Sequence, residues 1–557
     1  MRDRPMSSLS SQSDQRPGQQ EEVPILIVGG SLVGLSTAMF LSWHGVPSLT
    51  VERHDGTAIY PRAGHFHLRT IELFRSVGIE SAVRRASEEQ FPPDGGISAV
   101  ESLAGNEIVH YITNLNEDVA EFSPTVRLFM TQQSLEPIIR DRAVTLGATL
   151  RYSTELTSFD QDATGVTAVT KERNTGAERL IRTKYLVAAD GNRSPIREHL
   201  GIAMHGHGHL TNSVTIYFQA NCEPLLRGRN LGVIYVFNPT LRGFFRLENR
   251  GKSGFLVVNT VGDTSLPQAA NVSEGITEDR CIELVRSAIG IPDIPVQIQD
   301  VAPWSAVADA AVRFQDGRVF LVGDAAHVMP PNGGFGGNTG VQDAHNLAWK
   351  LAMVLRGTAG DGLLSTYNTE RQPVGALAVE QAYLRYVLRS APYLATKEMP
   401  SRIVDEFTME IGYRYNSTAT ALERGDSGAL FEHPRHSKAR PGSRAPHLVL
   451  QRATTQLSTL DLFGKSFVML AGPDGCTWCE AWREAAKMIG IEAEAYLVDE
   501  TADPEHRFPN LYGVSTQGAV IVRPDGFVGW RAKTADGASA RRLSSVLASL
   551  LCLDARS

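Results

Sequence analysis

Short apolar runs alternate with helical repeats along the chain, a pattern typical of an α/β fold. The run 23–28 precedes an Ala- and Leu-rich stretch that ends at Gly45, and the run 48–51 follows it. Two more apolar runs lie at 185–189 and 319–322. Short runs rich in Val, Ile and Leu predict buried strands, whereas apolar residues at every third or fourth position predict amphipathic helices. We therefore expect buried strands covered by helices.

Acidic residues follow two of these predicted strands. Asp190 follows one strand, and Gly323 and Asp324 follow another. After Asp324, a glycine-dense loop leads into a helix predicted to begin near Asn338. Open α/β sheets bind ligands at the carboxyl edge of their strands, and a helix N-terminus carries a partial charge of roughly +0.5. The sequence therefore predicts a ligand at this edge that is negative or becomes negative.

The first predicted strand, the helix after it and the second strand carry the pattern of a dinucleotide-binding unit. Gly29 and Gly34 occupy the outer positions of G-x-G-x-x-G, and Ser31 replaces the middle glycine. Glu52 ends the second strand, where an acid binds the ribose of such a cofactor. This acid favours a ribose with a free 2′-hydroxyl. The alternative is a tight turn without a ligand.

Length and composition narrow the class of protein. A chain of 557 residues should contain about two to four domains, and its net charge of −7 gives no reason to expect nucleic acid or an anionic membrane as partner. No apolar run approaches the roughly 18 residues of a membrane span. Residues 1–22 lack the apolar segment of a signal peptide, and we interpret them as a disordered tail. Five cysteines in a chain of this size indicate a reducing cytoplasm.

Residues 201–300 alternate between apolar and polar positions, and residues 91–124 lose regular periodicity. Period-two alternation with many aromatic residues predicts an antiparallel sheet. Such a sheet would form one wall of a pocket for a flat apolar substrate. The candidate lining residues are Tyr235, Phe237, Phe244, Phe245 and Trp304. The alternative is that these side chains belong to the core of the sheet.

The C-terminal part of the chain predicts a separate small α/β domain. Helical patterns run from about 363 to 425, and the Pro- and Gly-containing stretch 435–447 indicates a boundary. Strands are predicted at 466–470 and 519–522. Between them, the C-x-x-C run 476–479 precedes a predicted helix, which is the redox arrangement of thioredoxin and lowers the pKa of the first thiol. A disulfide oxidoreductase is therefore a rival hypothesis.

Three motifs in this order resemble those of the class A flavoprotein aromatic hydroxylases. They are the glycines of the first turn, the Asp190 motif and the Asp324 motif with its glycine loop. The resemblance covers about residues 23–395. The run 337–351 is most similar to the branch that acts on aromatic polyketides, and 440–447 is similar to the motif before that branch's thioredoxin-like C-terminal domain.

The resemblance implies an α/β fold in three parts: a Rossmann-like FAD-binding domain, an interleaved antiparallel-sheet substrate domain and a C-terminal thioredoxin-like domain. The implied ranges are 23–90, 125–200 and 301–395 for the FAD-binding domain, 91–124 and 201–300 for the substrate domain, 396–445 for a helical segment and linker, and 446–557 for the thioredoxin-like domain. Gly518 stands where thioredoxin has its cis-proline. This difference favours a remnant, or a domain for stability or oligomerisation, over disulfide exchange.

The resemblance also implies which residues hold FAD. The expected cofactor-binding residues are Gly29, Ser31, Leu32, Val33, Gly34, Glu52, Arg53, Arg62, Arg127, Gln132, Asp190, Asp324, Pro331, Gly336, Gly337 and Asn338. Glu52 would bind the adenosine ribose, Asp324 the ribityl chain, and Arg62 the pyrophosphate. Backbone N–H groups of Gly337 and Asn338 would face the pyrimidine end of the isoalloxazine, where reduced flavin is anionic.

Four further roles follow from the resemblance. Arg127 would lie near the adenosine half of FAD, and Gln132 along its ribityl and phosphate groups. Pro331 would lie near the reacting edge, and the motif of Asp190 is linked to both FAD and NADPH. Because Ser31 is small, we expect a slightly displaced pyrophosphate rather than a loss of binding.

The implied activity is a hydroxylation. NADPH or NADH would reduce FAD, O2 would add to give a C4a-hydroperoxide, and the distal oxygen would pass to an aromatic polyketide. No side chain is required as a nucleophile, and His65, His67 and His327 are chemically able but fit structural roles better. The alternatives are a hydroxylase of single-ring phenols and a flavin enzyme for epoxidation or Baeyer–Villiger oxidation of a polycycle. We expect no metal, and a cytoplasmic monomer or homodimer.

Overall fold

The computed structural model describes residues 20–57, 64–261, 272 and 275–553, and its first eight-stranded sheet brings the predicted strands together. The sheet has the order β16-β17-β10-β1-β2-β7, and β8 and β9 extend it beside β10. The bounds are β1 Glu21–Val28, β2 Ser48–Val51, β7 Thr149–Arg151, β8 Thr154–Gln161, β9 Val166–Glu172, β10 Glu178–Ala188, β16 Gln315–Asp316 and β17 Val319–Leu321. Strands β17, β10, β1, β2 and β7 run parallel, so their carboxyl ends meet at one edge.

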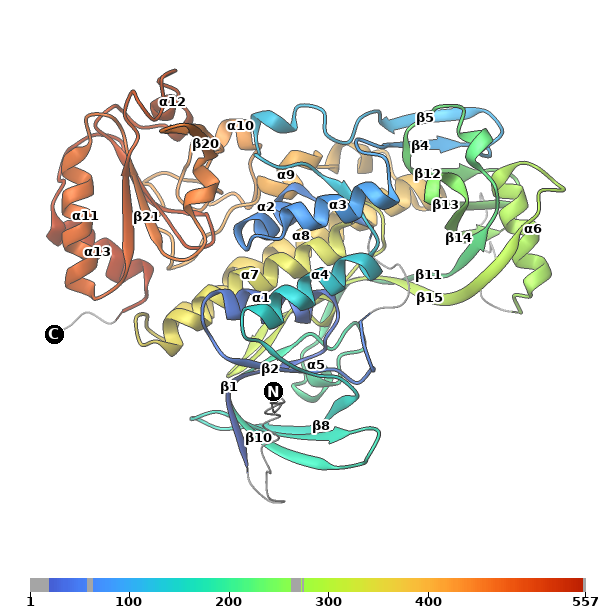
Figure 1. Ribbon diagram of the computed structural model, residues 1–557, viewed down its shortest axis with the longest axis horizontal. Helices are drawn as coiled ribbons and strands as arrows, with labels where there is room; N and C mark the ends of the chain where they lie inside the picture. Colours follow the sequence, from blue (N-terminus) through green and yellow to red (C-terminus); the bar gives the residue numbers. More distant parts are fainter. Residues whose placement is uncertain (1–19, 58–63, 262–271, 273–274, 554–557) are drawn as a thin grey trace, which may run out of the picture.

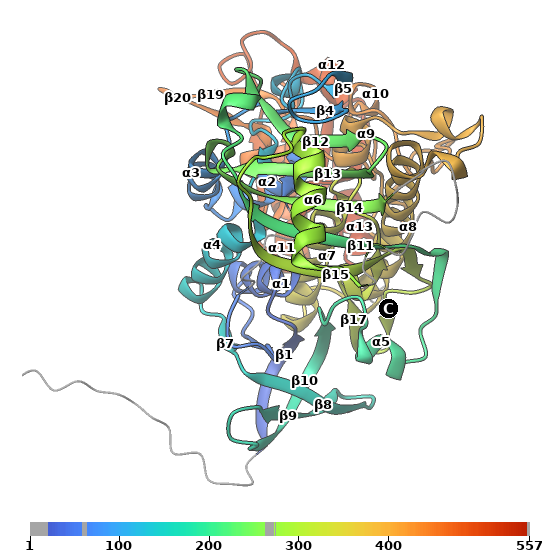
Figure 2. The same cartoon turned by 90° about the vertical axis from the view of Figure 1, so that its right-hand side faces the viewer.

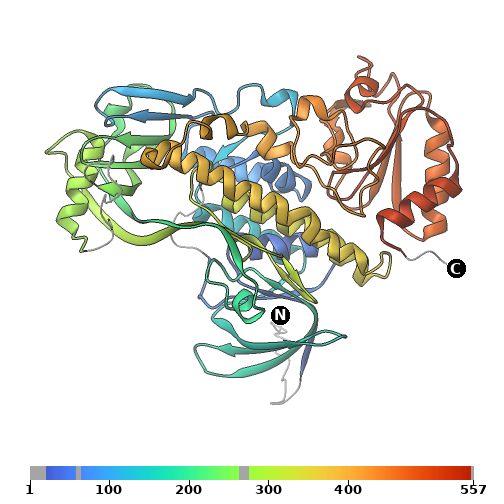
Figure 3. The same cartoon turned by 180° about the vertical axis from the view of Figure 1, so that it is seen from behind.

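Helices cover this sheet and fill the centre of the molecule (Figure 1). The bounds are α1 Leu32–Trp43, α2 Leu68–Ser76, α3 Glu80–Gln90, α4 Gln132–Thr145, α5 Pro195–His199, α7 Phe335–Leu355 and α8 Gly362–Ser390. Helix α7 is buried along nearly its whole length, and Figure 3 shows α8 running beside it from behind. A helix that is buried on all sides must satisfy its polar side chains inside the protein. None of the helices among the described residues is long and apolar enough to cross a membrane.

The second eight-stranded sheet has the order β18-β15-β11-β14-β13-β12-β4-β5. The bounds are β4 Gly96–Val100, β5 Glu107–Ile112, β11 Met204–Gln219, β12 Leu231–Phe237, β13 Leu241–Glu248, β14 Ser253–Val261, β15 Gln297–Ala311 and β18 His327–Val328. Helix α6, Glu278–Ile289, covers one face of this sheet (Figure 2). The expected antiparallel sheet is confirmed except for the parallel pair β12 and β4. Strand β15 continues through the boundary expected at residue 300.

The C-terminal domain has a four-stranded sheet of the order β22-β21-β23-β24. The bounds are β21 Phe467–Ala471, α11 Cys476–Ile489, β22 Ala493–Leu497, β23 Ala519–Val522, β24 Val528–Ala532 and α13 Ala540–Leu550. Trp478 and Trp482 of α11 pack with Leu543 and Leu547 of α13 in one core. Both predicted strands and the helix after the C-x-x-C run are present, which agrees with the expected α/β domain.

Two expectations about helices were wrong. Helix α7 begins at Phe335 instead of near Asn338, because Gly334 adopts a φ of +72° and ends the glycine loop there. The helical pattern expected to about 425 ends at Ser390, and the chain then forms short turns and the short helix α9, Glu406–Ile411. Ala391 has a φ of −134° and a ψ of 57°, which are not helical, and Pro392 begins a short turn directly after it.

A buried ionic network joins α7 and α8 to the C-terminal domain. Glu370 of α8 accepts hydrogen bonds from Lys350 of α7, at 2.7 Å, and from Arg523, at 2.6 Å. Arg523 also pairs with Asp525, and Asn346 donates to Glu370 at 2.8 Å. The paired side chains are at most 2% exposed. The network therefore places two cations and two carboxylates where water is excluded.

Candidate active site

Four strand ends of the first sheet form one edge, and each carries a residue expected to bind the cofactor. Glu52 and Gly29 directly follow β2 and β1. One residue separates Asp190 from the end of β10, and two residues separate Asp324 from the end of β17. Neighbouring parallel strands in this order place these positions side by side. The three motifs, which are far apart in the sequence, therefore meet at one carboxyl edge, where open α/β sheets bind ligands.

The glycines at this edge are required by close backbone contacts. A Cβ on Gly34 would lie 1.8 Å from the carbonyl oxygen of Gly29, and a Cβ on Gly29 would lie 2.2 Å from that of Ala189. A Cβ on Gly340 of α7 would lie 2.5 Å from a methyl carbon of Val33 and 3.0 Å from the Cα of Gly323. The first turn of α1 and the second turn of α7 thus pack directly against the strand end that carries Asp324.

Glu52 holds the first turn from the neighbouring strand. Its Oε2 accepts a hydrogen bond from the Gly30 N–H at 2.6 Å, and its Oε1 accepts one from the His54 N–H at 2.8 Å. Arg53 is exposed next to it. The expected role of Arg62 falls outside the described residues. Glu52 therefore presents a fixed carboxylate beside the backbone of the glycine turn.

Ser31 joins the start of α1 to the start of α4. Its hydroxyl donates to Glu136 at 2.6 Å, and the amide of Gln132 donates to the Ser31 hydroxyl at 2.9 Å and to Glu136 at 2.7 Å. A glycine at position 31 would leave this network without its central hydroxyl. Gln132 thus lies at the first glycine turn, and Leu32 and Val33 begin α1 beside it. The expected role of Gln132 near the phosphate groups stays a prediction.

The two aspartates at the strand ends differ in their surroundings. Asp190 accepts from the Ile196 N–H at 3.2 Å through Oδ2, whereas its buried Oδ1 has no hydrogen-bond partner among the described residues. Burial raises the pKa of this carboxyl above its usual value. Asp324 is exposed at its strand end. An outside partner with hydroxyl groups would satisfy Asp190 Oδ1 and could reach Asp324.

The glycine loop and the first turn of α7 are fixed by Asn338. Its Oδ1 accepts from the His67 N–H at 2.9 Å and from the Thr70 hydroxyl at 2.6 Å. Its Nδ2 donates to the carbonyls of His65, at 2.8 Å, and Gly334, at 2.7 Å. The side chain of Asn338 is therefore a structural bridge to α2, and Gly336 and Gly337 form the first turn of the helix without side chains.

A buried charge cluster supports the Asp324 strand end from behind. Asp343 of α7 accepts from the Gly323 N–H at 3.1 Å and pairs with His327 at 2.7 Å and with Arg371 at 2.8 Å. Arg371 and His327 hold the pKa of Asp343 below its usual value despite its burial. His327 was one of the histidines considered for a catalytic role. It is fully buried, and its Nε2 pairs with Asp343 in this cluster.

Arg127 is committed to other partners than the glycine turn. Its Nε donates to Glu410 of α9 at 2.8 Å, its Nη1 donates to the Leu115 carbonyl at 2.7 Å, and its guanidinium carbon lies 4.6 Å from the ring centroid of Phe407. The Glu410 carboxylate also accepts from the Leu68 N–H at the start of α2. The expected contact with the adenosine half stays a prediction.

The predicted aromatic wall lies on one face of the second sheet. Tyr235 is paired with Phe244, Phe244 with Val257, and Val257 with Thr215 across neighbouring strands. Trp304 donates from Nε1 to the Thr215 hydroxyl at 3.0 Å. Directly opposed residues of paired strands share a face. These side chains therefore form a row on the face opposite α6.

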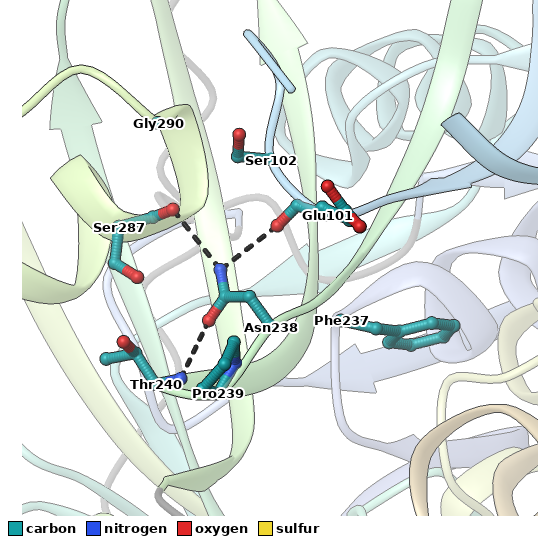
Figure 4. A pocket seen from close by; sticks show the side chains of 8 residues that line it. All are labelled: Glu101, Ser102, Phe237, Asn238, Pro239, Thr240, Ser287 and Gly290. Carbon is teal, nitrogen blue, oxygen red and sulfur yellow. Dashed lines mark hydrogen bonds between the residues drawn. The ribbon is translucent and has the colours of Figure 1, made fainter. Parts of the chain in front are cut away.

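The remaining two aromatic candidates lie on opposite faces of the sheet. Phe245 is 1% exposed and belongs to the core beneath α6, so its expected place in the lining was wrong, because alternate residues of a strand face opposite sides. The ring centroid of Phe237 is 6.0 Å from that of Tyr235. Phe237 also lines an open surface hollow of about 480 Å³, where Asn238 donates to the carbonyls of Glu101 and Ser287 (Figure 4).

The glycine loop touches the aromatic wall through residues that sequence reasoning missed. Asn332 is buried and donates to the Tyr235 hydroxyl at 3.4 Å. Arg389, from the end of α8, donates to the same hydroxyl at 3.4 Å, and its guanidinium carbon lies 4.7 Å from the ring centroid of Tyr111. Asn332 directly follows Pro331, which was expected at the site, so its position in the glycine loop could have identified it. No feature of the sequence marks Arg389 or Tyr111 as site residues.

The C-x-x-C pair has the asymmetric exposure of a dithiol site. Cys476 is exposed at the first residue of α11, and Cys479 is buried, which raises the pKa of its thiol. A Cβ on Gly518 would lie 2.6 Å from the Cβ of Val514, so the position expected to hold a cis-proline is closely packed. The redox role of the pair stays a prediction.

Two family models match the chain. The model described as an FAD binding domain matches residues 22–382, and the model described as the C-terminal part of an aromatic-ring hydroxylase matches residues 438–552. The first range contains all four strand ends of the candidate site. The second contains the four-stranded C-terminal sheet.

Known proteins are similar to the chain over nearly its whole length. A 4-methyl-5-nitrocatechol 5-monooxygenase of a Burkholderia species is 56% identical and covers 95% of this chain and 98% of its own. Tetracenomycin A2 monooxygenase-dioxygenase of Streptomyces glaucescens is 40% identical and covers 95% and 97%. The crystal structure of aklavinone-11 hydroxylase with FAD and aklavinone matches with a TM-score of 0.89 at 37% identity, covering 96% of this chain and 100% of that one.

Proposed function

Because the chain belongs to the FAD-dependent aromatic-ring hydroxylases, we propose that it uses NAD(P)H and O2 to add oxygen to the ring of a phenol. The observation that carries the proposal is the meeting of four parallel strand ends with the N-terminal parts of α1 and α7. The aromatic face of the second sheet supports it, because Tyr235 is in contact with Asn332 of the glycine loop. A flat ring held there would lie next to the cofactor site.

The residues at this edge fit FAD. Gly29 and Gly34 leave a turn lined by backbone, which suits a pyrophosphate, and Glu52 provides a carboxylate for ribose hydroxyls. Asp190 has a buried oxygen without a partner among the described residues, and Asp324 is exposed for the ribityl chain. Bound FAD, once reduced by NAD(P)H, would supply the activated oxygen that is transferred to the ring.

The protein's own contribution would be charge stabilisation and orientation. The first turn of α7 would stabilise negative charge next to it, because a helix N-terminus carries about +0.5 charge. The Tyr235 hydroxyl accepts hydrogen bonds from Arg389 and Asn332, so it would donate its own hydrogen to a phenolic oxygen of the substrate. The buried aromatic side chains around it would exclude water from the reacting ring.

We favour a single-ring catechol that carries a nitro group as the substrate. The support is that the relative with 56% identity is named for 4-methyl-5-nitrocatechol, whereas the polyketide enzymes are about 40% identical or less. Oxygen transfer to a ring carbon that bears a nitro group would release nitrite and leave a quinone carbonyl. The net reaction would consume one O2 and one NAD(P)H and would form one water.

The test is a turnover assay on purified protein. The protein should be yellow, and NAD(P)H oxidation should rise when 4-methyl-5-nitrocatechol is added, with one nitrite released for each NAD(P)H consumed. The matched control is 4-methylcatechol, which has no nitro group to lose. Protein that takes up no FAD, or that oxidises NAD(P)H at the same rate with and without any phenol, would refute the proposal.

A polycyclic phenol of the polyketide type is the second candidate. It is favoured by the match with aklavinone-11 hydroxylase, which extends over the whole of that chain. The same assay with an anthraquinone polyphenol separates the two candidates, because the ratio of kcat/KM for the two substrates reports the preference. Comparing NADPH with NADH in this assay would also identify the reductant.

A further inference from the structure

Arg246 of β13 is a buried arginine that the chain only partly satisfies. It is 3% exposed, and its Nε and Nη2 atoms have no hydrogen-bond partner among the described residues. Burial lowers its pKa to about 10, and Glu248 on the same strand opposes this shift. Leaving a buried donor unpaired costs roughly 1–3 kcal/mol, and more if the group is charged. A guanidinium in this state is suited to an anion that comes from outside the chain.

The position of Arg246 relates it to the substrate face. It is two residues from Phe244 on the same strand, so both side chains are on the face that carries Tyr235. Its guanidinium carbon lies 4.4 Å from the ring centroid of Phe91 and 4.9 Å from that of Phe129. The faces of these rings attract a cation, but they offer no hydrogen-bond acceptor in the plane of the guanidinium group.

His65 supplies a third unsatisfied nitrogen, beside the two of Arg246. Its Nε2 has no partner among the described residues, and its ring centroid is 5.0 Å from that of Phe129. The ring also packs on the glycine loop, since a Cβ on Gly334 would lie 3.4 Å from its Nδ1. His65 therefore lies between Arg246 and the loop that leads into α7.

The charges around His65 are positive on balance. Burial, His67, Arg127 and Arg246 all lower the pKa of His65, which keeps its ring neutral and able to donate one hydrogen bond. Arg127 pairs with Glu410 through Nε, but its Nη2 also has no partner among the described residues. Arg246 and Arg127, each with an unsatisfied nitrogen, are therefore both close enough to His65 to lower its pKa.

We propose that Arg246, with His65 beside it, binds the charged oxygen of a phenol that enters the site as its anion. The inference rests on the proposed function and adds that the preferred substrate is anionic. A nitro group withdraws electrons from the ring and makes a neighbouring phenol ionise more readily, so a nitrocatechol meets this requirement at neutral pH. A neutral phenol would leave the buried guanidinium unpaired, and a site built around a polar partner rejects a ligand without it.

The test compares the binding of two ligands to the FAD-loaded enzyme, followed by the change in the flavin spectrum. The variants are Arg246→Met, which removes the charge, and Arg246→Lys, which keeps it without the planar fork. Arg229→Met is the matched control, because the Arg229 guanidinium is fully partnered by Glu107 and by carbonyls of the same domain.

Arg246→Met should weaken the binding of 4-methyl-5-nitrocatechol about ten- to a hundredfold, the range for a lost charged hydrogen bond. The binding of 4-methylcatechol should change less than threefold. Arg246→Lys should recover part of the loss, and Arg229→Met should bind both ligands as the wild type does. In the wild type, the Kd for the nitrocatechol should fall as pH rises through the ligand's own pKa, and Arg246→Met should lose this dependence.

An equal loss for both ligands, or no loss for either, would overturn the inference. Arg246→Lys provides the same comparison if Arg246→Met fails to fold or to retain FAD. A wild type that hydroxylates no phenol at all would refute the proposed function instead. If the wild type consumes the nitrocatechol and Arg246→Met prefers it over 4-methylcatechol as strongly as the wild type does, the role of Arg246 is refuted and the proposed function is not.

Discussion

Replacing Glu370 by glutamine tests whether the buried ionic network holds the C-terminal domain to the cofactor domain. The variant keeps the size of the side chain and removes its charge. Lys350 would then lose the carboxylate it binds at 2.7 Å, and Arg523 would keep one carboxylate partner, Asp525. The pKa of Lys350 is already lowered to about 8 by burial, so the variant leaves a cation that the interior disfavours.

The expected loss follows from the burial of the three partners. Glu370, Lys350 and Arg523 have side chains that are 0% exposed, and breaking a buried pair by removing one partner costs about 3–5 kcal/mol. That is a large share of the roughly 5–15 kcal/mol by which a folded domain is stable. The matched control is Glu283→Gln, whose pair with Arg280 is exposed and should contribute at most about 1 kcal/mol.

Urea unfolding of the FAD-loaded enzyme measures both variants. Tryptophan fluorescence reports unfolding of the whole chain, because Trp478 and Trp482 are buried in the C-terminal core and Trp349 of α7 packs in the same cluster, and flavin release reports the cofactor domain. At an unchanged slope, the shift in midpoint gives the loss of stability. A loss for Glu370→Gln no larger than for Glu283→Gln would refute the reasoning, because it would mean that the desolvation cost of these ions cancels their attraction.

Three further predictions follow. Gly34→Ala should abolish FAD retention, because its Cβ would lie 1.8 Å from the Gly29 carbonyl oxygen, and the flavin absorbance of the purified variant measures this. Burial lowers the pKa of His447 from 6.5 to about 4. Between these two pH values, His447 is therefore protonated in the unfolded chain but neutral in the folded chain. The stability should therefore fall as pH drops from 6.5 towards 4, and His447→Gln should flatten this part of the curve of melting temperature against pH. The double variant Cys476→Ser, Cys479→Ser should keep full turnover of the phenol, measured as NAD(P)H oxidation. A loss of turnover in this variant would favour the hypothesis that the thiols are redox-active.

The cofactor edge could be predicted because its signals are local. An apolar run followed by a glycine turn or an acid marks a strand end wherever it occurs, as at Gly29, Glu52, Asp190 and Asp324. Parallel strands then bring such ends together without any knowledge of the contacts between them. The same logic identified β21, β23 and α11 of the C-terminal domain. The bounds of β21 and β23 differ from the predicted ones by at most one residue at each end.

The substrate wall was only partly predictable, because its contacts join distant segments. Period-two alternation placed Tyr235 and Phe244 on a sheet but could not say which face meets the glycine loop, and Phe245 was therefore misplaced. No motif in the sequence singles out Arg246 or Arg389. Their burial depends on the packing of β13 and of the end of α8, which no local pattern records.

Helix α7 has a consequence for how enzymes of this kind can be recombined. Its first turn adjoins the glycine loop, and its later residues Asn346 and Lys350 give their polar groups to Glu370, while Asn346 also reaches Asp525 at 3.4 Å. A chimera that takes its last hundred residues from a relative would therefore graft one half of an ion cluster onto a mismatched other half. Productive crossovers should keep α7, α8 and the C-terminal sheet from a single parent.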